Sequence, residues 1–149
     1  MPHDRNQNRN KKQNNWQDGK SIADEYFDKN LKQLLNMGEA EDLDKLIDNI
    51  SEMIRIKGNG ITTSQLRNIF GKIKPMTEIR QLKLIRPQLA YIAARQVGKV
   101  SGNAKRNIAD FIAFLDELIR ETDQNGLEGF KQFMESVVAY HKYHHPKNA

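Results

Sequence analysis

The side chains whose types and spacing best allow chemistry are the cations in the middle third of the chain. Residues 61–106 carry ten Lys and Arg side chains and one acidic side chain, Glu78. A solvated helical face normally interleaves both signs, so a segment this one-sided repels itself unless an anion neutralises it. The pattern favours contact with a phosphate-rich polyanion, and the alternative is a surface whose charge serves solubility alone.

Histidines and acidic residues offer two other kinds of chemistry. His141, His144 and His145 cluster near the C-terminal end, where they can in principle join a metal site or act as acid and base in RNA cleavage. No acidic partner lies near them in the sequence, so we expect the cluster to face solvent. The acidic run over residues 41–48 can attract Mg²⁺, but it is more typical of a solvated helix face.

Enzyme signatures are missing from the sequence. It contains no HExxH, GxSxG, GxxxxGK[ST] or GxGxxG motif, and no strand pattern precedes the turn at residues 58–60 as a phosphate-binding loop requires. We therefore predict that the protein is not an enzyme and holds neither a cofactor nor a metal.

Composition restricts the fold and the compartment. The 149 residues are 38% hydrophobic, which suits one domain, and Cys is absent. We find neither a signal-peptide pattern nor a membrane-spanning apolar run, and expect a cytoplasmic protein that contacts no membrane. Residues 1–20 are basic and rich in Asn and Gln, which predicts a disordered tail with Trp16 as its one large apolar side chain. Residues 21–145 are predicted to form the helical RNA-binding domain.

The apolar period is helical from residue 21 onward, which predicts an all-α, single-domain bundle of about five or six helices. A short first helix is expected over residues 22–35. The next helix carries an apolar stripe that ends at Ile54, and Gly58 is its expected stop. Thr62 and Gln65 have the spacing of a capping box, so a further helix should begin at Thr63.

The helix from Thr63 should bury one face and present a cationic face. Its predicted core positions share helical spacing: Leu66, Ile69, Phe70 and Ile73. The opposite face carries Ser64, Arg67, Gly71 and Lys74, and Gly71 would let a backbone approach closely. Pro75 ends this helix.

A second cationic face is expected after another short helix that begins near residue 78 and contains Lys83. Pro87 disfavours helical geometry at Arg86, so we expect a break there. The helix that follows presents Gln88, Tyr91, Arg95 and Lys99 together. Tyr91 can stack on a base or lie half-buried in the core.

Two long helices complete the predicted bundle. Asn103 is expected to cap the first of them, which places Lys105 and Arg106 in a first turn where the helix dipole disfavours cations. We expect a bound anion to compensate. The last helix begins near Leu127, and the tail over residues 141–149 is expected to fray.

These observations predict a non-catalytic protein that binds the RNA backbone in a salt-dependent, largely sequence-independent way. The candidate contact residues are Arg67, Lys74, Lys83, Arg86, Tyr91, Arg95, Lys99, Lys105 and Arg106. The polar residues at the start of the Thr63 helix keep an alternative open, a helix-turn-helix-like transcriptional regulator that reads DNA.

Two of these segments resemble a known family, the small subunit of the type III-A CRISPR effector (Csm) complex. The motifs are TTSQLRNIF, from Thr62 to Phe70, and PQLAYIAAR, from Pro87 to Arg95. The C-terminal FKQFMESVVAYHKY segment extends the resemblance, so it covers roughly residues 40–143.

The resemblance implies an α-helical subunit of an antiviral ribonucleoprotein that multimerises beside RNA-cutting backbone subunits and cuts nothing itself. Its implied partners are crRNA and target RNA, the backbone and large subunits of the complex, and other copies of this chain. Arg67 and Arg95 occupy basic positions of the two motifs, so the resemblance implies that they contact RNA. The other cations are candidates on the charge argument alone.

Overall fold

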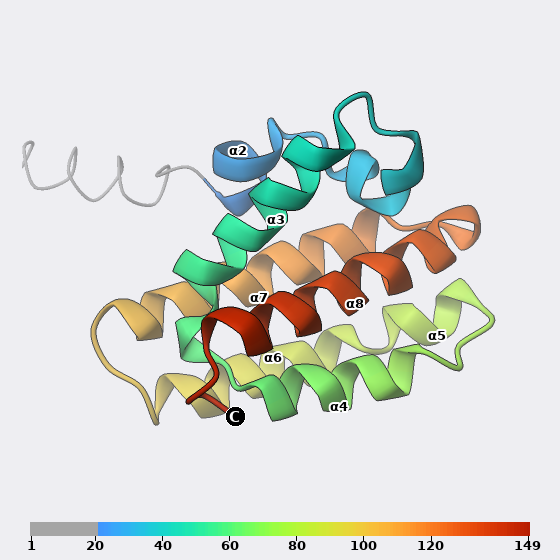
Figure 1. Ribbon diagram of the computed structural model, residues 1–149. Helices are drawn as coiled ribbons and strands as arrows, with labels where there is room; N and C mark the ends of the chain where they lie inside the picture. Colours follow the sequence, from blue (N-terminus) through green and yellow to red (C-terminus); the bar gives the residue numbers. More distant parts are fainter. Residues whose placement is uncertain (1–20) are drawn as a thin grey trace, which may run out of the picture.

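Helices in three layers make up the part of the chain that the structure describes, residues 21–149 of a computed structural model. Helices α7 (Asn103–Glu121) and α8 (Leu127–His144) form the middle layer, with a 3-10 turn (Gln124–Gly126) between them. In Figure 1, α2 and α3 lie on one side of this layer and α4, α5 and α6 on the other. The predicted all-α fold is confirmed, and no strand occurs in residues 21–149. The predicted tail over residues 1–20 lies outside the described residues.

The middle layer supplies much of the core. Helix α7 buries Phe114 and six further apolar side chains at helical spacing: Ile108, Phe111, Ile112, Leu115, Leu118 and Ile119. Phe114 packs edge-to-face on Phe133 of α8 and stacks on Phe27 of α2 at a centroid distance of 5.6 Å. These rings join the middle layer to the α2 side of the molecule.

The first predicted helix is only partly correct. Residues 22–35 form a short helix, α2 (Ile22–Phe27), and a separate 3-10 helix (Leu31–Leu35). Asp28 and Lys29 have positive φ angles, which interrupt the helical path between the two. A further 3-10 turn (Met37–Glu39) leads to α3 (Leu43–Lys57), which ends at Gly58 as predicted.

Helix α4 (Thr63–Ile73) begins where the sequence predicts. The Thr62 hydroxyl accepts from the Gln65 N–H at 3.1 Å, and the Gln65 side chain accepts from the Thr62 N–H at 3.0 Å. Leu66, Ile69 and Ile73 are buried below this helix. A turn of 3-10 helix (Gly58–Gly60) connects α3 to α4.

The next two helices are separated by a shorter break than expected. Helix α5 (Ile79–Lys83) is followed by two residues with right-handed helical dihedral angles, and α6 (Arg86–Val97) begins at Arg86 itself. Pro87 therefore lies in the first turn of α6, where its missing N–H costs no hydrogen bond. The expected break at Arg86 falls instead at residues 84–85.

The start of α7 differs from the prediction. Gly102, with a φ of 62°, takes the N-cap position and Asn103 is already helical, with no side-chain cap. Within residues 21–149, no helix is long and apolar enough to cross a bilayer.

The C-terminal segment does not fray, so that expectation was wrong. Main-chain N–H groups of Thr63 and Ser64 donate to the carbonyl oxygens of Asn148 and Ala149 at 2.9 and 3.0 Å. The Asn148 amide donates to the carbonyl oxygen of Ile61 at 2.7 Å and to that of Asn59 at 3.2 Å. The end of the chain thereby satisfies amides at the start of α4 that the capping box leaves open.

Candidate nucleic-acid interface

The cationic face predicted for α4 lies on the surface. Ser64, Arg67, Gly71 and Lys74 are all exposed. Arg67 and Lys74 form neither an ion pair nor a side-chain hydrogen bond with any residue in 21–149. Both cations are therefore available to an external anion, although the hydroxyl and main-chain N–H of Ser64 already bind Ala149.

Helix α6 presents its four predicted side chains together. Gln88, Tyr91, Arg95 and Lys99 are exposed, and Tyr91 keeps 65% of its surface open to solvent. The opposite side of the helix buries Leu89 and Gln96, and the Gln96 amide donates to the Gly60 carbonyl at 3.0 Å. Tyr91 thus lies outside the core, which answers the question that its sequence context left open.

A contact that the sequence did not predict joins the two cationic helices. The Lys72 amine of α4 donates to the Gln88 side chain of α6 at 2.9 Å. Lys72 leaves α4 about 160° around the helix from Lys74, so one edge of α4 faces α6 while the edge with Lys74 points away from it. The helices that carry the two cationic faces lie in the same layer (Figure 1). The helical positions predict that the two faces point in different directions. Residues 16 apart meet here through tertiary packing, which no local pattern encodes.

Two candidate residues are engaged in holding the fold. The Lys83 amine donates to the carbonyl oxygens of Ile119 and Arg120 at the end of α7, at 2.6 and 3.0 Å. Arg86 pairs with Asp116 of α7 at 2.7 Å. Burial lowers the pKa of Lys83, and the hydrogen bond from Arg86 holds the pKa of Asp116 below its usual range. Both cations therefore have partners that an RNA phosphate would have to replace.

The remaining candidates lie at the start of α7. Lys105 and Arg106 are exposed in its first turn, which carries no acidic side chain. Asn107 follows them and donates to the Ile56 carbonyl and the Asn59 side chain, at 3.1 and 2.9 Å. This turn is therefore anchored to the α3–α4 connection while its two cations reach solvent.

The C-terminal histidines contradict the expectation that they face solvent. His141 has 0% exposure, and its ring nitrogens contact the Thr63 hydroxyl at 2.7 Å and the Gly58 carbonyl at 2.8 Å. His144 bonds the Ser51 hydroxyl at 2.8 Å, and His145 bonds the Ile54 carbonyl at 2.9 Å. A carbonyl only accepts, so Nε2 of His141 donates to Gly58, and in the neutral ring Nδ1 can accept from the Thr63 hydroxyl.

Burial is the main cause of a lowered pKa at His141, and it lowers the pKa of His144 as well. Both ring nitrogens of His141 are hydrogen-bonded inside the fold, so this residue is not placed to move a proton on a substrate. In residues 21–149, no group of three or more His, Asp or Glu side chains is arranged to hold a metal ion.

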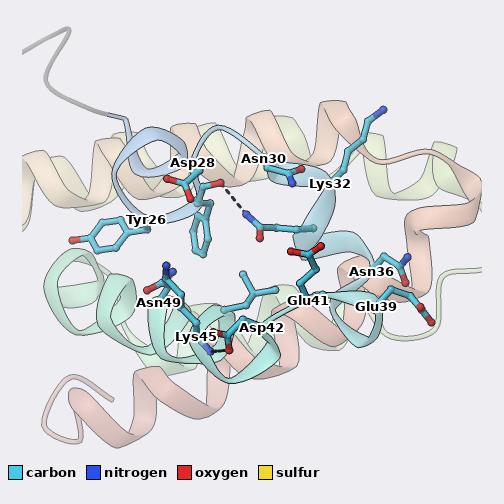
Figure 2. Close-up of a pocket in the computed structure, with 14 residues that line it drawn as sticks. Tyr26, Asp28, Asn30, Lys32, Asn36, Glu39, Glu41, Asp42, Lys45 and Asn49 are labelled. Atoms are coloured by element: carbon cyan, nitrogen blue, oxygen red, sulfur yellow. Dashed lines mark hydrogen bonds between the residues drawn. The ribbon is translucent and has the colours of Figure 1, made fainter.

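An open pocket of about 530 Å³ lies in the opposite layer, between α2 and the start of α3 (Figure 2). Buried Phe27 and Leu46 contribute its apolar wall. Its polar rim combines carboxylates, primary amides and two Lys side chains: Asp28, Asn30, Lys32, Gln33, Asn36, Glu39, Glu41, Asp42, Lys45 and Asn49. This mixed, largely acidic rim does not suit a phosphate, so the pocket is separate in place and in chemistry from the cationic layer.

Comparison with known proteins gives a match to the family Csm2 Type III-A, over residues 37–147. The chain belongs to this family. It is accordingly a small subunit of the type III-A CRISPR effector, the Csm complex. The match includes the cationic helices α4 and α6 as well as α7 and α8. Helix α2 and the first 3-10 helix precede it. No curated protein and no solved structure is significantly similar to the chain.

Proposed function

We propose that this Csm subunit is a non-catalytic protein that binds the backbone of crRNA and target RNA through the layer formed by α4, α5 and α6, together with the first turn of α7. The observation that carries the proposal is a set of exposed cations with no carboxylate partner in residues 21–149: Arg67, Lys74, Arg95, Lys99 and Lys105. Each phosphate that they neutralise releases counterions, which supplies affinity without reading sequence.

The contacts of the side chains also rank the eight cations among the nine predicted contact residues. Arg67, Lys74, Arg95, Lys99 and Lys105 are available without breaking any contact inside residues 21–149. Lys83 and Arg86 would have to leave α7 first. Arg106 is exposed and stays a candidate. We therefore propose that phosphate binding rests on the first group, with Lys72 as an additional contact beside Gln88.

The first turn of α4 is poorly placed to read a DNA operator, because its side chains are already in contact with other parts of the chain. Thr63 is buried, the Gln65 side chain caps Thr62, and Ser64 bonds Ala149. A recognition helix uses this end to contact bases. The tail that covers it would have to be displaced first, so the structure favours RNA-backbone contact over the regulator.

Surfaces outside the cationic layer can bind protein partners. We place the complex in the cytoplasm. The layer with α2 and α3 carries exposed acidic side chains on its outer face, including Asp44, Asp48 and Glu52. These can meet a cationic surface of the backbone subunit, the large subunit or another copy of this chain. We propose that the acidic layer serves assembly while the cationic layer serves RNA.

The test measures binding of the full chain to single-stranded RNA across a salt series. The wild-type protein should bind with little sequence preference, and its affinity should fall steeply as salt rises. Arg67→Glu with Arg95→Glu should weaken binding. The slope of log K against log salt should shrink by about 0.7 for each phosphate that the variant no longer neutralises.

The matched control is Lys32→Glu, which reverses an exposed cation of the opposite layer. It should leave RNA affinity unchanged, and circular dichroism should show that all variants remain helical. Salt-insensitive binding to one DNA sequence, or an equal loss of RNA affinity with Lys32→Glu, would overturn the proposal.

A further inference from the structure

We propose that one face of the α5–α6 segment, formed by Leu84, Gln88, Tyr91 and Arg95, is a platform for unpaired nucleobases of the bound RNA. This base-contact face adds a second kind of contact to the cationic layer. The inference rests on the proposed RNA binding, and the experiment below separates failure of the one from failure of the other.

Helical spacing brings the four side chains into one row. They follow each other at intervals of four, three and four residues, which keeps them within about 60° on a helix. Leu84 and Ile85 have φ, ψ angles of −73°, −10° and −72°, −24°, so right-handed helical geometry continues through the break before α6. The row therefore begins in the turn before α6 and continues along that helix.

Two members of this row are large apolar side chains that the core does not use. Leu84 is 72% exposed and Tyr91 is 65% exposed, whereas Leu82, Ile85 and Leu89 on the other side are buried. Large apolar side chains that share one exposed face are typical of a contact surface. They do nothing for the solubility of the protein.

The chemistry of the row fits bases rather than phosphates alone. A Tyr ring stacks on the face of any unpaired base, and an Arg guanidinium stacks on a base or pairs with a phosphate. The Gln88 side-chain oxygen is held by Lys72, which leaves its amide group to donate to a base edge. Residues 79–99 contain no acidic side chain to repel RNA.

The dimensions of the row also suit a nucleic-acid strand. Seven residues of helix separate Leu84 from Tyr91 by about 10 Å along the axis, close to three steps of about 3.4 Å between stacked bases. Leu84 and Tyr91 can then contact bases that lie three positions apart in one strand, with Gln88 between them.

The experiment compares two labelled single strands that have the same number of phosphates, a short CA-repeat RNA and an abasic ribose-phosphate strand of equal length. Fluorescence anisotropy at one low salt concentration gives the affinity of the full chain for each. Wild-type protein should bind the RNA about tenfold more tightly than the abasic strand, as expected for one or two stacked bases.

Substitutions then show which side chains cause the preference for RNA over the abasic strand. Tyr91→Ala should reduce the preference to near unity while leaving affinity for the abasic strand unchanged, and Tyr91→Phe should restore it. Leu84→Ala should reduce the preference in part. Tyr143→Ala, at a 75% exposed tyrosine of α8, is the control that should change neither affinity.

Equal wild-type affinity for the two strands would overturn the base-contact face while leaving phosphate binding intact. The base-contact face would also be overturned if Tyr91→Ala weakened binding to both strands equally. Failure to bind either strand at low salt would instead overturn the proposed function.

Discussion

Cations of the middle third differ in what their side chains contact, although the sequence presents them as one group. Arg86 pairs with Asp116 and Lys83 binds two carbonyl groups at the end of α7, whereas Arg95 and Lys99 extend into solvent. Counting charges finds all of these cations because it gives only the net charge of the segment. It cannot separate them, because the partners of Lys83 and Arg86 lie more than 29 residues away in the sequence.

The pair Arg86→Ala and Arg95→Ala tests this division. Arg86→Ala should lower the free energy of unfolding only slightly, since the ion pair with Asp116 is partly open to solvent. Its effect on RNA affinity should be smaller than that of Arg95→Ala, which should leave stability unchanged. Urea melts and RNA titrations on both variants measure the two effects. Equal loss of RNA affinity in both variants would contradict the division.

The buried His141 makes the stability of the fold depend on pH. Its pKa is lowered from the ordinary value of 6.5, so the folded chain binds fewer protons here than the unfolded chain below about pH 6.5. Stability contributed by this site should be complete above that pH and should fall as pH drops further. His144 acts in the same direction, and the neighbouring His145 ring lies 4.9 Å from His141.

Urea melts at pH 7.5 and pH 5.5 should therefore show a less stable protein at the lower pH. His141→Gln cannot titrate, so the difference between the two conditions should shrink in this variant even if it is less stable at both. The comparison uses the difference and not the absolute stability. An unchanged difference in His141→Gln would show that other groups control the pH dependence.

Among the elements, those specified by local signals were predicted best. The capping box that starts α4 and the stop of α3 at Gly58 both depend on residues a few positions apart, and both are confirmed. The docked C-terminal segment was missed because its partners, Gly58 and residues 61–64, are 78 or more positions away. Nothing in the local sequence around the three histidines and Asn148 indicates that they hydrogen-bond to distant parts of the chain.

Two glycines in helices give predictions of opposite sign. A Cβ on Gly129 of α8 would clash with the Leu35 carbonyl group, so Gly129→Ala should lower the free energy of unfolding by about 3 kcal/mol or more. A Cβ on Gly71 of α4 would meet nothing within 4 Å, so Gly71→Ala should stabilise the fold by about 0.5 to 1 kcal/mol. Thermal melts of the two variants measure these changes.

Gly71→Ala also tests the approach of RNA to α4. Gly71 lies between Arg67 and Lys74 on the exposed face, where a missing side chain lets a backbone come close. RNA affinity should fall in this variant although its stability rises. Unchanged affinity would show that RNA does not contact α4 at this point and that the α6 side of the layer carries the binding.

The whole molecule places opposite charges on opposite layers. Residues 21–60, which form the α2–α3 side, carry nine acidic and five basic side chains, whereas residues 61–106 carry one and ten. The sequence shows this division along the chain, but only the fold shows that α7 and α8 lie between the two charged layers. The acidic and the basic segments of the sequence therefore form two separate faces of the folded molecule.

Opposite faces on one chain predict head-to-tail association of copies when salt is low. The attraction should be strong at about 0.01 M salt, where the screening length is about 30 Å, and weak at 1 M, where it is about 3 Å. Sedimentation velocity of the full chain across this range should show larger species only at low salt. Added RNA should dissolve them, because it competes for the cationic layer.

Charge reversal can separate this association from RNA binding. Asp48→Lys on the exposed face of α3 should reduce self-association and leave RNA affinity unchanged, whereas Arg95→Glu should reduce both. Glu135→Lys, an equal change of net charge on the exposed side of α8, is the control for a general charge effect. If Glu135→Lys and Asp48→Lys reduce association equally, net charge and not the acidic layer controls it. If only Asp48→Lys does so, each face of the subunit has its own partner, and RNA and protein contacts can form at the same time.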